Sequence, residues 1–167
     1  MRLALTDMFR ARWTNEIHEE WIAAVLEDHP NLARQQLERT RDMMNDAVLD
    51  CVITGYEGMA NHVALPDAND RHVLAAAIRC QAGVIVTSNL KDFPQATLSQ
   101  FGIEAQHPDE FISHLFDLSP AVVCTTVKKQ RKSLTRPPQT IDELLNTFLS
   151  LGLATTVESL RTMKDLL

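Results

Sequence analysis

The sequence predicts an α/β fold with a parallel sheet, since short apolar runs alternate with helical segments through residues 1–118. The clearest run is Val84–Thr87, which turn residues bound on both sides, as in a strand covered on both faces. Ile103–Gln106 and Cys51–Thr54 are the other predicted strands. Strands that alternate with helices in this way favour a sheet sandwiched between helices.

Three helical segments are predicted before Cys51–Thr54, the first predicted strand in chain order. Met1–Trp13 has apolar residues on roughly one side and no start signal. Thr14 is the predicted N-cap of a second helix, which runs to about Asp28. Pro30 separates that helix from a third, Leu32–Ala47.

Two further helices are predicted around the apolar run 84–87. Pro66 and Asp67 begin the first, and Gly83 ends the turn that follows it. Pro108 begins the second, directly after the predicted strand 103–106.

The character of the chain changes after residue 118. Residues 119–167 begin with a helix at Pro120 and then show two capping-box patterns, in which Thr140 and Thr155 are each followed three residues later by Glu. The chain is therefore divided into an α/β domain, residues 1–118, and a helical C-terminal extension.

The composition excludes several classes of protein. Nearly half of the 167 residues are hydrophobic (45%) and Gly and Pro are sparse, which indicates a globular rather than a disordered chain. The three cysteines form no CxxC pair, so a reduced, cytoplasmic protein is expected and a zinc site is not. The apolar runs are too short to cross a membrane, and no signal peptide is expected.

The net charge of −6 is unevenly distributed. Residues 120–167 hold seven Lys and Arg against four Asp and Glu, a net of +3, so the rest of the chain has a net of −9. A passive nucleic-acid-binding protein is normally basic overall. This distribution instead fits an acidic metal pocket and a separate cationic strip that meets phosphate.

Acidic residues gather at the start of the helix that Pro66 begins. Asp67 and Asp70 have one simple explanation as N-cap and first-turn acid of that helix. Alternatively, Asp70 projects past the strand ends and coordinates Mg²⁺ or Mn²⁺, because hard cations prefer carboxylate oxygens. Ligands of open parallel sheets bind at the carboxyl ends of the strands, where this residue is expected. Both explanations hold together if Asp67 caps and Asp70 coordinates.

Other charged residues also have a structural and a functional explanation. Glu16 and Glu20 lie four apart on one helix and fit a solvated acidic face. Alternatively, because Glu20 lies beside the apolar stripe, it points into a site that borders the core. His72 is interpreted as structural. A solvated helix face or phosphate contact explains the basic cluster Lys128, Lys129, Arg131 and Lys132.

A polar loop follows the apolar run 84–87. It carries a hydroxyl and an amide, Thr87 and Asn89, and then a carboxylate, Asp92. Such loops are common in α/β proteins, and they are also where a further metal-binding carboxylate is expected. Lys91, in the same loop, is either solvated or in contact with a phosphate.

The run LPDANDRHVLAAAIRCQAGVIVTSNLKDFP resembles the PIN-domain nucleases, especially the bacterial PIN proteins related to toxin–antitoxin ribonucleases. Its Asp-x-x-Asp-Arg element opens a helix, and a Thr-x-Asn-x-x-Asp-Phe loop follows the next strand. The resemblance extends upstream through RARWTNEIHEEW and downstream through GIEAQHPDEFI, over roughly residues 10–115.

The resemblance implies a metal-dependent endoribonuclease that cleaves single-stranded RNA with Mg²⁺ or Mn²⁺. Glu20, Asp70 and Asp92 match the metal-binding acids, and Thr87 and Asn89 match the loop residues that position water or phosphate. An antitoxin-like protein partner and a homodimer are also implied. A third alternative, an unrelated hydrolase of phosphate esters, is disfavoured because the sequence has no Gly-rich phosphate loop or nucleophile motif.

The sequence departs from the family at its start. PIN domains begin with a strand that ends in an Asp, and no such run precedes Leu3. The expected fold is thus a three-layer α/β/α sandwich without its first strand, with a hydrophobic edge exposed. Either the start codon is misplaced or the first metal ligand is lost. In the second case a catalytically degenerate protein that binds RNA or an antitoxin is the rival function.

Overall fold

The computed structural model describes residues 2–167 as a mixed α/β protein that is mostly helical. The α-helices are α1 (Asn15–Asp28), α2 (Arg34–Ala47), α3 (Glu57–Ala60), α4 (Arg71–Arg79), α5 (Gln95–Leu98), α6 (Pro108–Leu118), α7 (Pro120–Ser133), α8 (Ile141–Ser150) and α9 (Ala154–Thr162). The strands are β1 (Val84–Val86) and β2 (Glu104–Gln106), and short 3-10 turns are η1 (Arg2–Leu5), η2 (Ala68–Asp70), η3 (Leu90–Asp92), η4 (Ser99–Phe101) and η5 (Lys164–Leu166). No described helix is long and apolar enough to cross a membrane.

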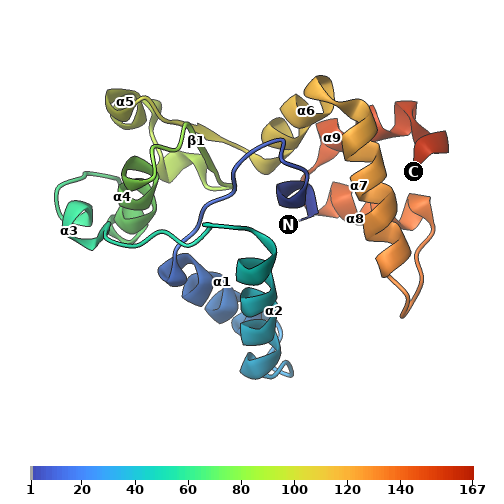
Figure 1. Cartoon of the computed structure of the whole chain (residues 1–167), viewed down its shortest axis with the longest axis horizontal. Coiled ribbons are helices and arrows are strands. Elements are labelled where there is room, and N and C mark those ends of the chain that lie inside the picture. The colour runs from blue at the N-terminus through green and yellow to red at the C-terminus, as the bar shows by residue number, and fades with distance from the viewer. Residues whose placement is uncertain (1) are drawn as a thin grey trace.

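Three groups of elements are visible in Figure 1. Helices α4 and α5 lie beside the two strands and α3 lies beside α4, while α1 and α2 form a hairpin and α6 to α9 gather at the C-terminal end. β1 and β2 pair in parallel, with Ile85 opposite Ala105. The described residues thus hold a two-stranded parallel sheet, and the predicted three-layer sandwich is not confirmed.

The sheet and α4 share one hydrophobic cluster. Leu74 of α4, Ile85 of β1 and Leu98 of α5 are buried in it, and Leu74 and Leu98 are fully inaccessible to solvent. Burial of such side chains contributes about 1.5–3 kcal/mol each. This cluster fixes the ends of α4 and β1, from which the predicted site residues project.

A second cluster joins α6 to the C-terminal helices. Leu115 of α6, Val123 of α7, Leu145 of α8 and Leu160 of α9 are buried there. α6 packs more extensively against α9 than against any element of the sheet. The predicted boundary between residues 118 and 119 stays a prediction, and this core extends on both sides of it.

A helix is predicted over Met1–Trp13, but among its described residues only the 3-10 turn η1 is helical. The prediction is wrong for residues 6–13. Asp7 has φ of 57°, a left-handed conformation that interrupts any helix. Leu3, Met8 and Phe9 pack against the C-terminal cluster. The apolar spacing therefore reflects contacts with distant helices rather than a local helical period.

The strand predicted at Cys51–Thr54 is a single parallel bridge between Trp13 and Val52. Gly55, at φ of 75°, turns the chain before more pairs form. β1 and β2 confirm the other two predicted strands. β1 is not covered on both faces, however, since Val86 is 45% exposed.

Most predicted helix starts are confirmed. Thr14 accepts from the Ile17 amide at 3.0 Å and caps α1, and Thr140 forms a complete capping box with Glu143. The second capping box is wrong. The amides of Thr155 and Thr156 instead donate to the carboxylate of Asp109 on α6 at 2.9 and 2.8 Å, so a distant residue caps α9.

Candidate metal centre

Three aspartates meet where α4 begins and where β1 ends. Asp67 precedes η2, Asp70 ends η2, and Asp92 ends η3, in the loop after β1. One carboxylate oxygen from each lies within 4.8 Å of the other two. Asp67 also accepts from the Asn69 amide at 2.9 Å, so the predicted cap is confirmed and the same side chain faces the cluster.

This cluster of aspartates is electrostatically strained. Partial burial, followed by the neighbouring charges of Asp67 and Asp92, raises the pKa of Asp70 above its ordinary value. In the described part of the chain no Lys or Arg forms an ion pair with any of the three. A divalent cation is the group that this donor set fits, since hard cations bind carboxylate oxygens and would relieve the repulsion.

The loop after β1 orients one of the three acids. The Thr87 hydroxyl accepts from the Asn89 amide at 3.1 Å, and the Asn89 side chain donates to the carboxylate of Asp92. Because a carboxylate oxygen accepts more than one contact, this bond leaves acceptor capacity on Asp92. Thr87 and Asn89 thus act on the cluster through Asp92, in line with their predicted place beside that acid.

Glu20 lies in a different set of contacts. Its carboxylate is 2.8 Å from Nε2 of His72, which is buried on α4, while Glu16 lies 3.4 Å from Nδ1 of the same ring. The Tyr56 hydroxyl donates to Glu16 at 3.2 Å. His72 therefore links α1 to α4, which agrees with its structural interpretation. The predicted role of Glu20 as a metal ligand stays a prediction.

The sequence predicts Asp67 only as a helix cap, and the structure adds this residue to the acidic cluster. The signal was present in the Asp-x-x-Asp spacing, because residues three apart at a helix start lie on the same side. The contacts of Glu16 with His72 and Tyr56 had no such signal. They join segments 40 residues or more apart.

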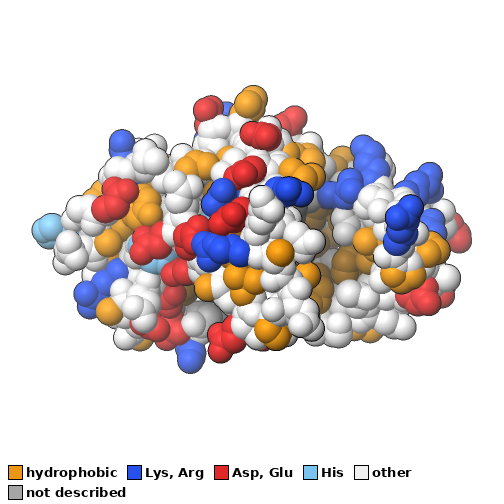
Figure 2. All heavy atoms as spheres, turned by 90° about the horizontal axis from the view of Figure 1, so that it is seen from below, with side chains coloured by type: hydrophobic (Ala, Val, Ile, Leu, Met, Phe, Trp, Pro, Cys, Tyr) orange, Lys and Arg blue, Asp and Glu red, His pale blue; other side chains and the backbone are white. Residues whose placement is uncertain are grey.

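The predicted phosphate-contacting residues lie in two places. Lys91 is exposed in η3, next to Asp92. The basic cluster is on α7, where Lys128 and Arg131 also reach the carbonyl oxygens of Leu166 and Leu167, each at 3.4 Å. Figure 2 shows Lys and Arg side chains gathered at the end of the molecule that carries the C-terminal helices, and more Asp and Glu elsewhere on that face.

The fold and the acid cluster define the class as an α/β protein with three carboxylates gathered at the end of a strand. Comparisons with known proteins give two matches. Residues 108–162 match the VapC50 C-terminal domain family. The chain is also 43% identical, over 77 residues, to the Mycobacterium tuberculosis protein named "Putative ribonuclease VapC50". That match spans 46% of each chain, about half of the relative's length. No solved structure matches the chain.

These matches confirm the family resemblance predicted from the sequence. Over the matched parts, the chain is similar to proteins of the VapC/PIN toxin type.

Proposed function

We propose that the chain is a metal-dependent endoribonuclease of toxin type that cleaves phosphodiester bonds of single-stranded RNA. The observation that supports this most is the set of three carboxylates within 4.8 Å of one another at the strand end, none of which forms an ion pair with a Lys or Arg among the described residues. The name of the M. tuberculosis relative supports the same class of substrate.

Asp70, Asp92 and Asp67 would hold Mg²⁺ or Mn²⁺, with Glu20 as a further predicted ligand. The chemistry that such an ion supplies when bound is activation of a water molecule and stabilisation of charge on the phosphate. Asn89 holds the carboxylate of Asp92 in place. Lys91, exposed on the same turn, is available to a phosphate oxygen of the substrate.

The proposed partners follow from the same family. RNA is the substrate, and Lys128, Lys129, Arg131 and Lys132 on α7 form a basic strip for its backbone, because each phosphate contact releases a counterion. An antitoxin-like protein is the proposed regulator, and a symmetric homodimer is the proposed assembly. A three-layer PIN sandwich belongs to this proposal as well.

The test compares cleavage of a mixed single-stranded RNA pool by the chain and by Asp70→Asn, in Mn²⁺ and in EDTA. We expect Mn²⁺-dependent cleavage that the substitution lowers at least about a hundredfold, because one ligand and its charge are lost. Glu158→Gln, which removes an exposed acid of α9, is the matched control and should cut normally. Equal cleavage by Asp70→Asn would overturn the assignment of the site.

A second candidate function is a binding protein without catalysis. The contact of Glu20 with His72 favours it, since this acid is then engaged away from the three aspartates. Such a protein binds RNA or an antitoxin-like partner and cuts nothing, with or without Mn²⁺. RNA retention in a filter assay without cleavage by the wild-type chain would therefore select this function.

A further inference from the structure

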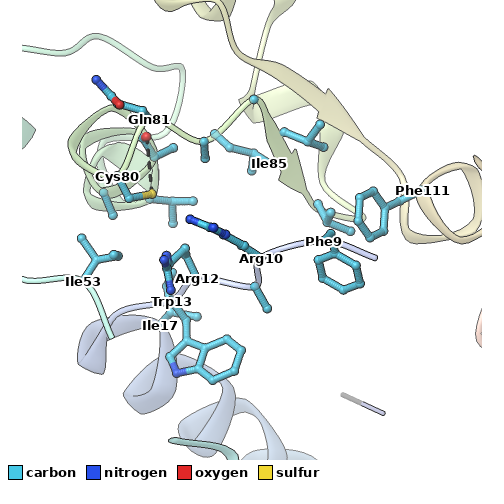
Figure 3. Close-up of a pocket in the computed structure, with 18 of the residues that line it drawn as sticks. Phe9, Arg10, Arg12, Trp13, Ile17, Ile53, Cys80, Gln81, Ile85 and Phe111 are labelled. Atoms are coloured by element: carbon cyan, nitrogen blue, oxygen red, sulfur yellow. Dashed lines mark hydrogen bonds between the residues drawn. The ribbon is translucent and has the colours of Figure 1, made fainter. Parts of the chain in front are cut away.

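A polar cavity of about 480 Å³ lies against α8, in contrast to the mostly apolar cavity drawn in Figure 3. Its walls come from the loop before α8 and from one face of that helix, on which residues three, four and seven apart lie together. The lining residues are Pro137, Pro138, Gln139, Glu143, Asn146, Thr147 and Ser150. The cavity is in the size range of ligand pockets, and most of its side chains can form hydrogen bonds.

The polar walls of this cavity offer oxygen acceptors. Gln139 Oε1 is buried and has no hydrogen-bond partner within the described chain. The amide and the hydroxyl of Thr140 both donate to Oε2 of Glu143, so Oε1 of that carboxylate is left as an acceptor. The hydroxyls of Thr147 and Ser150 donate to backbone carbonyl oxygens of α8, which leaves their lone pairs as acceptors. A ligand that fits therefore carries several N–H donors.

Basic residues precede the cavity in the chain. Arg131 and Lys132 lie in the last turn of α7, and Arg136 stands directly before Pro137 in the loop that leads to α8. Figure 2 shows Lys and Arg side chains gathered at the end of the molecule that carries the C-terminal helices. These charges attract an anion and repel a cationic donor, such as an arginine side chain of a partner protein. The ligand that fits is thus a group rich in N–H donors that is joined to a negative charge.

We propose that this cavity binds an unpaired guanine base of an RNA strand whose phosphates lie along the basic cluster of α7. RNA is the substrate of the proposed function, on which this site rests, and guanine adds a base preference. Single-stranded RNA is read through hydrogen bonds to base edges that are free of pairing. Guanine has adjacent N–H donors at N1 and N2, whereas adenine and cytosine offer one amino group and uracil one imide.

Each wall of the cavity has a role in this recognition. The free acceptors of Glu143 and Gln139 take the N–H groups at N1 and N2 of the base. The rings of Pro137 and Pro138 supply an apolar surface for the face of the base. Asn146, whose amide both donates and accepts, is available to the O6 acceptor.

The test measures binding without cleavage, on the full chain in EDTA. The probes are fluorescein-labelled hexaribonucleotides of uridine that carry one guanosine, inosine or adenosine, with hexauridine as the reference. We expect the guanosine probe to bind about tenfold more tightly than hexauridine by anisotropy, because its donors meet acceptors that otherwise lack partners. Inosine lacks the amino group at N2 and should bind about threefold more weakly than guanosine. This comparison needs no substitution in the protein.

A substitution assigns the preference to the cavity. Glu143→Gln keeps a residue that can complete the capping box of α8 and removes the charged acceptor. It should lower the preference for guanosine about fivefold and leave the affinity for hexauridine unchanged. Glu158→Gln, which removes an exposed acid of α9 outside the cavity, should change neither.

The outcomes separate this site from the proposed nuclease activity. A chain that prefers guanosine and cuts no RNA in Mn²⁺ would keep the guanine site and refute only the nuclease. Equal binding of the guanosine, inosine and adenosine probes, or a preference that Glu143→Gln leaves intact, would overturn the guanine site. So would tight binding of a capped arginine peptide that Glu143→Gln abolishes, since a protein partner would then be the occupant.

Discussion

Asp70→Asn should raise the stability of the metal-free protein, although it removes a residue of the proposed site. Carboxylate oxygens of Asp67 and Asp92 lie within 4.8 Å of those of Asp70, and no hydrogen bond within the described chain holds the Asp70 side chain as a cap. The substitution keeps the size of the side chain and removes its charge. The protein should therefore lose repulsion and little else.

The magnitude follows from Coulomb's law. Two unit charges 4.8 Å apart repel by roughly 1 kcal/mol in water and about 3.5 kcal/mol at an effective dielectric constant near 20. Asp67 is exposed, and Asp70 and Asp92 are partly exposed, so the lower value applies. Relief of two such contacts amounts to about 1–2 kcal/mol, which for a chain of this length raises Tm by about 2–8 °C.

The dependence on pH has a definite sign. The pKa of Asp70 is raised in the folded state, so the folded chain binds a proton more readily than the unfolded chain. The ionised group lowers stability at neutral pH, and this penalty disappears as the pH falls through the folded-state pKa. The difference in Tm between wild type and Asp70→Asn should therefore be present at pH 7 and vanish in acid.

Thermal melts in EDTA at low salt provide the measurement, with Glu158→Gln as the control for loss of an exposed acid. About 0.5 M KCl should reduce the gain in Tm of Asp70→Asn over the wild type, because salt screens charges that lie close to solvent. Mn²⁺ should raise Tm of the wild type more than that of the variant. A variant that melts at or below the wild-type temperature in EDTA, or a gain that salt leaves intact, would refute the electrostatic reasoning.

The remaining predictions concern the C-terminal helices and are read by urea unfolding. Asp109→Ala should cost about 2–4 kcal/mol, because the amides of Thr155 and Thr156 lose a buried charged acceptor, and Asp109→Asn should cost about half as much. Burial raises the pKa of Asp109, but the hydrogen bonds from Thr155 and Thr156 outweigh burial and leave the pKa below its usual value. The stability that Asp109 contributes should therefore be lost only as the pH falls through that lowered pKa. Thr140→Ala should cost about 1 kcal/mol through the lost cap of α8, and no measurable loss would contradict the capping box.

The sequence predicted those features of the fold that local signals determine. Thr14, Thr140 and Pro108 mark helix starts through side chains or rings that act within one turn, and the structure confirms all three. Thr155 carries the same signal and fails. Asp109, 46 residues away, takes the amide that a local cap would satisfy, and no local pattern reports that competition.

The same difference between local signals and contacts of distant residues explains what could be predicted of the site. Asp70 and Asp92 were predictable because each stands at a fixed offset from an element that the sequence defines well. Their approach to Asp67 follows from two local facts, the i to i+3 spacing at η2 and the return of the chain after β1. The contact between Glu20 and His72 needs α1 and α4 to be brought together across 52 residues of chain. Sequence can therefore name the acids that gather at a strand end, while the partner that holds each acid is a property of packing. Asp70→Asn tests the function of this site, and it is expected to make the protein more stable because it relieves the repulsion from Asp67 and Asp92. A loss of RNA cleavage in this variant would therefore report a change in the chemistry of the site and not unfolding.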